Sequence, residues 1–342
     1  MIRAAGLALA LGLAGGAAMA ETQISILSFD DLEGWSEDRH DQALAAFQVT
    51  CGDMRHAEWR TLCALSEGVN SARGFFETFF LPVLIEDGGD GLFTGYFEPL
   101  LRGSREPDDR YRYPVYRLPP EARGQPWLSR RAIEQEGALE GLGLEIAWVD
   151  DPVALFFMQV QGSGRIRIGP GDVIRLGYAG SNGRNYTSVG QRLVTMGLFQ
   201  PHEVSADVIS NWVSANPVAG QELLWTNASF VFFRELSGHA PELGPLGAMN
   251  RPLTQMRSIA VDPAFVPLGT PVWIEKGGAD PLNRLMVAQD TGSAIKGAQR
   301  ADVFYGTGRI AGRRAGRIRD GGRMVVLLPI QRAYAMLEDS AQ

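Results

Sequence analysis

Apolar residues recur at helical intervals in the early part of the chain and at strand-like intervals later. Over residues 37–80 the spacing predicts two or three short helices, with clear apolar stripes in 41–48 and 59–65. A glycine-rich turn cluster at 88–91 then opens the first strand-like run, 92–99. We therefore expect an N-terminal helical part that leads into β-structure.

The middle of the chain mixes the two patterns. The apolar run 155–161 predicts a buried strand, and 165–168 alternates like its hairpin partner. A further strand is expected over 171–178. Helical spacing returns in 189–198 and in 202–216.

After residue 230 the chain is dominated by short apolar runs that glycine and proline separate. Strands at such close and regular spacing are typical of a small closed barrel rather than an open sheet. The runs that predict these strands are 258–261, 270–274, 285–288, 301–304 and 324–328.

The first residues have the pattern of an export signal. A basic start at Arg3 precedes an apolar stretch over 4–18, and small residues follow up to residue 20. The apolar stretch is too short for a spanning helix, and no later apolar run reaches the roughly 20 residues that a membrane helix needs. We expect residues 1–20 to be a signal peptide and the mature protein to be soluble and periplasmic. The length of the mature chain predicts roughly two domains.

Charge and cysteine content narrow the functional classes. The formal net charge of −7 argues against nucleic acid as a partner, because nucleic acid favours a basic surface, and a neutral or sugar-like ligand fits better. Cys51 and Cys63 are the only cysteines, and an oxidising compartment favours a disulfide between them over a metal site. The four histidines are scattered, so we predict neither a metal nor a cofactor.

Two aspartates are the candidates for chemistry. Asp290 and Asp302 each adjoin an apolar strand and nearby glycines, and burial of a carboxyl group raises its pKa enough to donate a proton near neutral pH. A turn-capping role is the more favoured reading for Asp290 at this point. Its triplet with Thr291 and Gly292 also matches the aspartic proteases, but those enzymes need two such triplets and this chain has one.

Charged, aromatic and amide side chains surround these segments. Lys296, Arg300 and Arg165 are interpreted as solvated or substrate-facing charges. Aromatic rings and amides suit sugars, yet they also fill β-sheet cores, and composition alone leaves both readings open. The residues in question are Thr94, Tyr96, Gln159, Gln161, Tyr178 and Asn182.

Several longer motifs then occur in a fixed order between about residues 91 and 328. They are Thr94-Gly-Tyr-Phe97, Phe157-Met-Gln-Val-Gln-Gly-Ser-Gly164, Gly177-Tyr-Ala-Gly-Ser-Asn-Gly183, Ser229-Phe-Val-Phe-Phe233, Val261-Asp-Pro263 with 266–271, and Gln289-Asp-Thr-Gly-Ser-Ala-Ile-Lys-Gly297. In these motifs the chain resembles the membrane-bound lytic transglycosylase A family, enzymes of Gram-negative bacteria that cleave peptidoglycan. The resemblance covers most of the mature chain.

The resemblance implies a mainly β fold with some α-structure: a double-psi β-barrel domain plus an inserted smaller β domain, with a substrate groove between them. On this basis we expect a helical part and first barrel portion over 21–100, an inserted substrate domain over 101–235, and the rest of the barrel over 236–342. The substrate-binding positions that we predict are Thr94, Tyr96, Gln159, Gln161, Gly162, Ser163, Gly164, Tyr178 and Asn182.

The resemblance also implies a reaction. The family cleaves the β-1,4 bond between N-acetylmuramic acid and N-acetylglucosamine and leaves a 1,6-anhydro ring. The family's catalytic aspartate maps onto Asp302, and its companion maps onto Asp290 as a supporting residue. We expect Asp302 to protonate the glycosidic oxygen and then to accept the proton of the muramyl 6-hydroxyl.

Two other functions stay open at this point. A β-1,4-glycan hydrolase would need a second carboxylate across the cleft, for which Glu98 or Asp262 could serve. A non-catalytic wall-binding protein would keep the groove without the chemistry. Peptidoglycan glycan strands are the expected partner, and cell-wall synthesis or division proteins are possible partners. Family members are often lipoproteins, but no cysteine ends this signal peptide, so we do not expect a lipid anchor.

Overall fold

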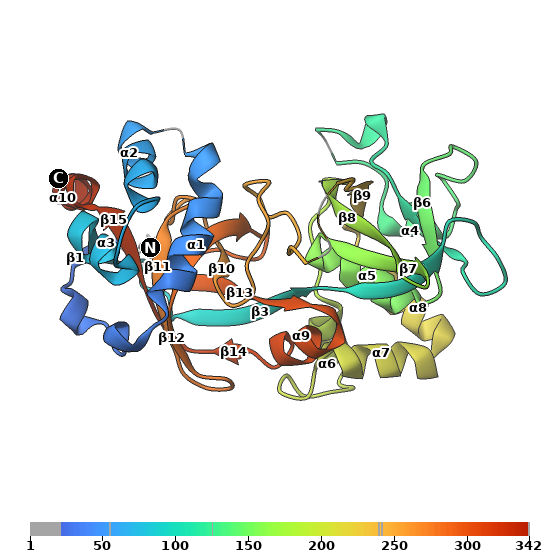
Figure 1. The fold of residues 1–342 in the computed structure, drawn as a ribbon. Coiled ribbons are helices and arrows are strands. Elements are labelled where there is room, and N and C mark those ends of the chain that lie inside the picture. Colours follow the sequence, from blue (N-terminus) through green and yellow to red (C-terminus); the bar gives the residue numbers. More distant parts are fainter. Residues whose placement is uncertain (1–21, 55, 125, 239, 241, 341–342) are drawn as a thin grey trace, which may run out of the picture.

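The protein is built from two β-sheets with helices packed around each. The computed structural model describes residues 22–54, 56–124, 126–238, 240 and 242–340, so the expected signal peptide lies outside the described residues. One sheet has nine strands and the other has six (Figure 1). Of the helices in these ranges, none combines the length and the apolar character that crossing a membrane requires.

The nine-stranded sheet combines the N-terminal part of the chain with the C-terminal third. Its order is β1-β2-β15-β11-β12-β10-β13-β3-β14. The strands are β1 (Gln23–Ile26), β2 (Phe80–Glu86), β3 (Leu92–Glu98), β10 (Ser258–Val261), β11 (Pro271–Lys276), β12 (Leu282–Thr291), β13 (Arg300–Thr307), β14 (Arg319–Asp320) and β15 (Gly322–Pro329).

This sheet curls back on itself, because β15 also contacts β3 although four strands separate them in the order. At the closure the backbones meet so tightly that a Cβ on Gly91 would lie 1.9 Å from the carbonyl oxygen of Gly322. Only glycine fits such an approach. The predicted small barrel is therefore present, with Phe93, Ile259 and Val303 in its core.

Helices cover this barrel on its outside. The helices α1 (His40–Thr50), α2 (Ala57–Ser66) and α3 (Ala72–Phe79) gather at one side in Figure 1, and α9 (Gly308–Ala315) and α10 (Ile330–Ser340) complete the set. The first three pack an aromatic cluster against Trp273 of β11 and Leu285 of β12. As the 37–80 pattern predicts, this part is helical.

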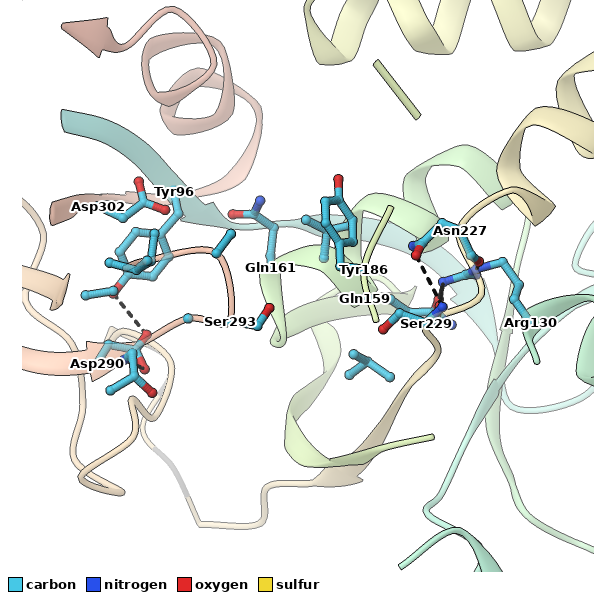
Figure 2. Close-up of a pocket in the computed structure, with 17 residues that line it drawn as sticks. Tyr96, Arg130, Gln159, Gln161, Tyr186, Asn227, Ser229, Asp290, Ser293 and Asp302 are labelled. Atoms are coloured by element: carbon cyan, nitrogen blue, oxygen red, sulfur yellow. Dashed lines mark hydrogen bonds between the residues drawn. The ribbon is translucent and has the colours of Figure 1, made fainter. Parts of the chain in front are cut away.

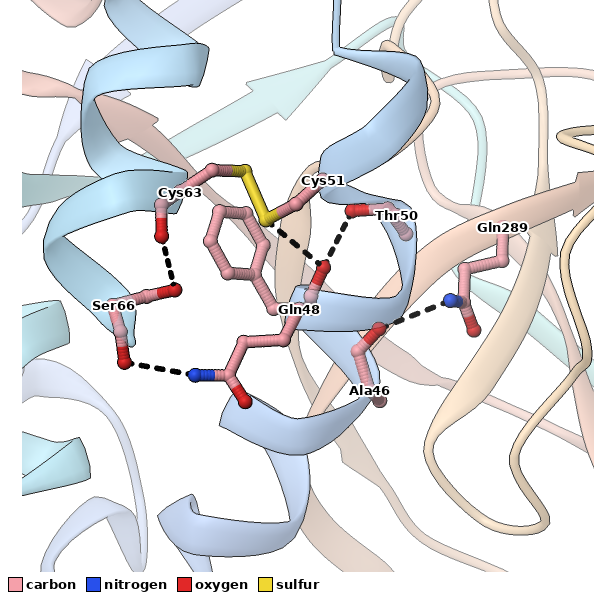
Figure 3. Close-up of a disulfide and its surroundings, with 8 residues drawn as sticks. Ala46, Gln48, Thr50, Cys51, Cys63, Ser66 and Gln289 are labelled. Atoms are coloured by element: carbon pink, nitrogen blue, oxygen red, sulfur yellow. Dashed lines mark hydrogen bonds between the residues drawn. A yellow bond between two sulfur atoms is a disulfide. The ribbon is translucent and has the colours of Figure 1, made fainter. Parts of the chain in front are cut away.

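A disulfide between Cys51 and Cys63 joins the end of α1 to α2 (Figure 3). Beside it, the side chain of Gln48 donates a hydrogen bond of 2.8 Å to the carbonyl of Ser66 in α2. The same helix α1 also reaches the barrel, since Nε2 of Gln289 on β12 donates to the carbonyl of Ala46 at 3.1 Å. The helices α1 and α2 are thus tied to β12, the strand that carries Asp290.

The six-stranded sheet lies between β3 and β10 in the sequence, in the order β5-β6-β4-β7-β8-β9. Its strands are β4 (Leu100–Ser104), β5 (Tyr113–Tyr116), β6 (Glu145–Val149), β7 (Gly164–Gly169), β8 (Asp172–Ser181) and β9 (Val231–Glu235). Its helices are α4 (Arg130–Glu134), α5 (Pro152–Gln161), α6 (Val189–Thr195), α7 (Ala206–Ala215) and α8 (Pro217–Trp225). We propose that the expected boundaries at residues 100 and 235 delimit an inserted domain.

One predicted element is wrong: residues 155–161 form the last seven of the ten residues of helix α5, not a strand. Pro152 occupies the first turn, the Asp151 side chain caps it by accepting from the amides of Val153 and Ala154, and Gly162 ends it in the left-handed region at φ 75°. The helix is apolar all round because it packs against two clusters, with Met158 in one and Phe156 in the other. A short run buried on both sides has no periodicity that separates strand from helix. The hairpin partner of β7 is β8.

An ion cluster joins the two sheets where β3 passes into β4. The carboxylate of Glu98 is 1% exposed and accepts hydrogen bonds from Nε of Arg165 on β7 at 2.6 Å and from the hydroxyl of Thr307 on β13 at 2.7 Å. Arg175 on β8 approaches its other oxygen at 3.4 Å. Both arginines also donate to the carbonyl of Leu243 in the returning connection. The interpretation of Arg165 as a solvated or substrate-facing charge is therefore wrong.

Because Glu98 neutralises buried guanidinium groups, we expect Glu98→Ala to lower the free energy of unfolding by roughly 3–5 kcal/mol. Urea denaturation of the mature protein measures this. The matched control is Glu67→Ala on the exposed end of α2, which should change the free energy by less than about 0.5 kcal/mol. Equal losses in the two variants would show that the cluster does not hold the sheets together.

Candidate active site

Two aspartates flank one small residue at the centre of the barrel sheet. In the strand register, Ala260 of β10 lies opposite Asp302 of β13 on one side and opposite Asp290 of β12 on the other. A bulge between Ile259 and Ala260 shifts the β10–β12 register so that Asp290 takes this place. The methyl side chain of Ala260 leaves open space between the two carboxyl groups.

Asp302 is held from the neighbouring strand. Thr94 of β3 lies opposite it in the parallel β3–β13 pair, and the Thr94 hydroxyl donates a 2.7 Å hydrogen bond to Oδ1. Among the described residues, none donates a hydrogen bond to Oδ2. One oxygen of Asp302 is therefore anchored and the other is available.

Asp290 is bound at both oxygens. The backbone amides of Thr291 and Ala248 each donate to Oδ1 at 2.9 Å, and the hydroxyl of Tyr96 donates to Oδ2 at 3.0 Å. The turn-capping role that the sequence favours for Asp290 corresponds to one of these contacts, the hydrogen bond from the Thr291 amide. The remaining two tie the 244–248 connection and β3 to the same carboxylate.

Burial sets the protonation of both groups. It raises the pKa of Asp302 to about 6, against the opposing effects of the Thr94 hydrogen bond and the charge of Arg300. Burial also raises the pKa of Asp290 to about 6, although its three hydrogen bonds lower it, and the negative charge of Asp302 adds to the rise. A carboxyl group with such a pKa can donate a proton near neutral pH and accept one afterwards.

Both aspartates line a cavity of about 310 Å³ that continues into a larger groove of about 900 Å³. Figure 2 shows Asp302, Tyr96 and Asp290 on one side of the cavity and Gln159, Ser229 and Arg130 on the other, with Gln161 between them. The first side belongs to the barrel and the second to the six-stranded sheet and its helices. A ligand in this groove would contact both sheets.

Six of the nine binding residues that the sequence predicts line the cavity or the groove. Tyr96, Gln159 and Gln161 line the inner cavity, and Gly162, Ser163 and Tyr178 line the larger groove.

Thr94 lies behind Asp302 and lines neither cavity. The structure does not bring Gly164 or Asn182 to the groove: Gly164 packs against Met158. Asn182 is fully buried, and its amide spans two loop carbonyls, so its role is to hold the fold.

The two glutamines are oriented by contacts that fix their amide groups. Arg130 donates to Oε1 of Gln159, and the backbone amide of Phe97 donates to Oε1 of Gln161 at 3.0 Å. Since the protein already donates a hydrogen bond to each carbonyl oxygen, the amino group of each glutamine remains as a donor for a ligand. Strand β3 and helix α5 therefore place hydrogen-bond donors beside the two carboxyl groups.

Sequence reasoning missed Arg130. This arginine is 2% exposed, its guanidinium lies over the rings of Phe156 and Phe230, and it donates to the carbonyls of Asn227 and Ser229. Nothing in the polar stretch around Ser129 distinguishes it from a surface arginine. Its partner Glu134 is only four residues away, but Gln159 and Ser229 are about 30 and 100 residues away, so the local sequence does not reveal that Arg130 lies at the cavity.

Residues 92–234 match the family model "MltA specific insert domain", and residues 257–328 match the "3D domain". The chain is 38% identical over 269 residues to the membrane-bound lytic murein transglycosylase A of Vibrio cholerae. These residues make up 74% of this chain and 71% of the relative. It is 37% identical over 249 residues to the protein of the same name from Escherichia coli K12, covering 70% of this chain and 66% of the relative.

Solved structures with the same fold come from the same group. A membrane-bound lytic murein transglycosylase from Agrobacterium tumefaciens superposes with a TM-score of 0.83 at 34% identity, covering 91% of this chain and 99% of that one. The E. coli MltA with bound chitohexaose gives a TM-score of 0.75 at 29% identity, covering 90% of this chain and 94% of that one.

The protonation of the site can be measured directly. We expect the carboxyl carbons of Asp290 and Asp302 to titrate near pH 6 in carbon-13 NMR, with Asp→Asn variants providing the assignment. Because both folded-state pKa values lie above the ordinary value of 3.8, each group favours folding most below pH 3.8, and this contribution is lost as the pH rises through 6. Titration of both below pH 4.5 would contradict the burial that we describe.

Proposed function

Because the chain belongs to the membrane-bound lytic murein transglycosylase A family, we propose that Asp302 is the single proton-transfer group of its reaction. The protein is a peptidoglycan lytic transglycosylase. It cleaves the β-1,4 bond between N-acetylmuramic acid and N-acetylglucosamine and forms 1,6-anhydromuramic acid ends. The roles of individual residues below are our proposal.

One observation carries the assignment to Asp302: it is the cavity-lining carboxyl group with an unengaged oxygen. Oδ2 of Asp302 receives no hydrogen bond from the described residues, whereas three donors occupy the oxygens of Asp290. A proton on Oδ2 can therefore reach a ligand without breaking a contact within the protein. A proton on Oδ2 of Asp290 would share that oxygen with the Tyr96 hydroxyl.

The reaction then needs one carboxyl group used twice. Protonated Asp302 donates its proton to the glycosidic oxygen as the bond to C1 of the muramyl sugar breaks. The resulting carboxylate accepts the proton of the 6-hydroxyl on the same sugar, and the 6-oxygen closes onto C1. Since the nucleophile is part of the substrate, no water has to be recruited and positioned. Asp302 ends the cycle protonated, as it began.

Asp290 supports this reaction by position. It ties Tyr96 to the turn that follows β12, and the 291–295 segment of this turn lines the cavity. Its own negative charge, when present, favours the protonated form of Asp302. We propose that Asp290 shapes the cavity and does not exchange protons with the substrate.

The two carboxylates that the hydrolase alternative nominates across the cleft are not in the site. Neither Glu98 nor Asp262 lines the cavity or the groove. Glu98 is bound in the ion cluster between the sheets, and Asp262 accepts hydrogen bonds from the amides of Gly297 and Ala264, with Lys296 at 3.5 Å. A purely wall-binding protein would not need a buried carboxyl group with a raised pKa. The lytic transglycosylase reaction fits the site best.

We propose a periplasmic location, because peptidoglycan lies there and residues 1–20 have the pattern of a signal peptide. Peptidoglycan glycan strands are the partner that the groove accommodates. Association with cell-wall synthesis or division proteins stays a prediction from family resemblance.

Mass spectrometry of the muropeptides released from purified sacculi tests the proposal. The wild-type protein should release 1,6-anhydro products, and Asp302→Asn should lower the rate by at least about a thousandfold because the acid is removed. Asp290→Asn should retain measurable turnover. Hydrated reducing ends from the wild type, or an inactive Asp290→Asn beside an active Asp302→Asn, would overturn the assignment.

The orientation of Gln159 makes a second prediction. Gln159→Glu keeps the oxygen that Arg130 binds but replaces the amino donor with an acceptor, so we expect chitohexaose to bind roughly tenfold more weakly with little change in thermal stability. Calorimetric titration measures the affinity. Gln135→Glu, just after the short helix α4, is the matched control outside the cavity. Unchanged affinity in Gln159→Glu would mean that its amide does not contact the glycan.

A further inference from the structure

A chain of two hydrogen bonds leads from an arginine to the proposed acid. Nη2 of Arg300 donates to the hydroxyl oxygen of Thr94 at 2.7 Å, and the same hydroxyl donates to Oδ1 of Asp302 at 2.7 Å. A guanidinium group can only donate, and a hydroxyl has one proton. Because Arg300 occupies a lone pair of the Thr94 oxygen, the threonine proton is directed to Asp302.

Arg300 is itself fixed in place. It lies half-buried at the start of β13, and Nη1 donates to the carbonyls of Leu92 at 3.2 Å and Ala301 at 2.5 Å. Among the described residues no carboxylate lies within ion-pair distance of its guanidinium. The interpretation of Arg300 as a solvated or substrate-facing charge is therefore wrong.

The charged groups that act on this pair come from three strands. Asp302 on β13 is the carboxylate that attracts Arg300, and Arg319 on β14 repels it. Asp290 on β12 acts on Asp302 from the other side of Ala260. The positive charge of Arg300 thus has one electrostatic target in the site, and the Thr94 hydroxyl connects them.

We propose that Arg300 is a positioning residue that acts through Thr94 to hold Oδ1 of Asp302 as a hydrogen-bond acceptor and so confines the acidic proton to Oδ2. This inference rests on the proposed role of Asp302 as the acid. Without Arg300 the Thr94 hydroxyl is free to turn and accept a proton from Oδ1. The acid would then divide its proton between two oxygens, only one of which is open to the substrate.

The same arrangement stabilises the carboxylate between the two proton transfers. After donation, Asp302 carries a negative charge in a partly buried site, which costs free energy unless hydrogen bonds and a nearby positive charge offset it. Thr94 supplies the hydrogen bond and Arg300 the charge. We therefore expect Arg300 to affect the chemical step and the titration of Asp302 rather than substrate affinity.

The test compares Arg300→Met with Arg309→Met, which removes the same charge from an exposed position on α9. For Arg300→Met we expect the Asp302 titration, followed by carbon-13 NMR, to move up by about half a pH unit or more, because an opposite charge is lost. The descending alkaline limb of the pH–rate profile should move in the same direction. At its optimum kcat should fall about tenfold with KM nearly constant, and Arg309→Met should change none of these.

Thr94 variants test the connection itself. Thr94→Val should reproduce the effects of Arg300→Met. The conservative variants Thr94→Ser and Arg300→Lys should keep most of the wild-type kcat. The double variant Thr94→Val with Arg300→Met should be no worse than either single variant, because both changes break the same connection. Additive losses, or a loss of kcat in Arg300→Met with an unchanged Asp302 titration, would overturn the proposal.

The NMR titration requires no turnover. Failure of the wild type to form anhydro products would therefore count against the proposed function, while the titration would still decide whether Arg300 acts on Asp302.

Discussion

The parallel pairing of β3 with β13 is the constraint on which the site depends. It joins two strands that are about 200 residues apart in the sequence and sets Thr94 opposite Asp302. Side chains alternate along a strand, so Thr94, Tyr96 and Glu98 share one face of β3. These three anchor Asp302, Asp290 and the ion cluster between the sheets, respectively. A slip of one residue would remove all three contacts together.

The opposite face of β3 is as closely determined. A Cβ on Gly95 would lie 2.8 Å from the Cα of Ala315 in α9, and a Cβ on Gly312 would lie 2.8 Å from the ring of Phe97. Helix α9 is thus packed against one face of β3, while the other face carries the residues that bind Asp302 and Asp290. This packing and the β13 register constrain β3 from two sides, which explains how a site built from single hydrogen bonds can hold its geometry.

The groove also depends on what joins the sheets. The Glu98 cluster binds arginines from β7 and β8, and the Phe97 amide binds Gln161 of α5, so the two walls meet through β3 itself. The proposed acid comes from one sheet, and the glutamine donors come from the other. The cavity exists only where the two sheets meet, because its lining residues come from both.

Local patterns in the sequence determined much of this protein. The helical part, the short barrel strands and the two glycine-flanked aspartates followed from periodicity and strand-end position, and the ordered motifs added the family. Tertiary structure decided the rest. The sequence predicts a strand over residues 155–161, where the structure has helix α5, because burial on both sides removes periodicity. It indicates solvated or substrate-facing charges at Arg300 and Arg165, because arginine is ordinarily exposed and their partners Thr94 and Glu98 lie 206 and 67 residues away. Hydrogen bonds across such separations depend on strand register, which no local pattern specifies.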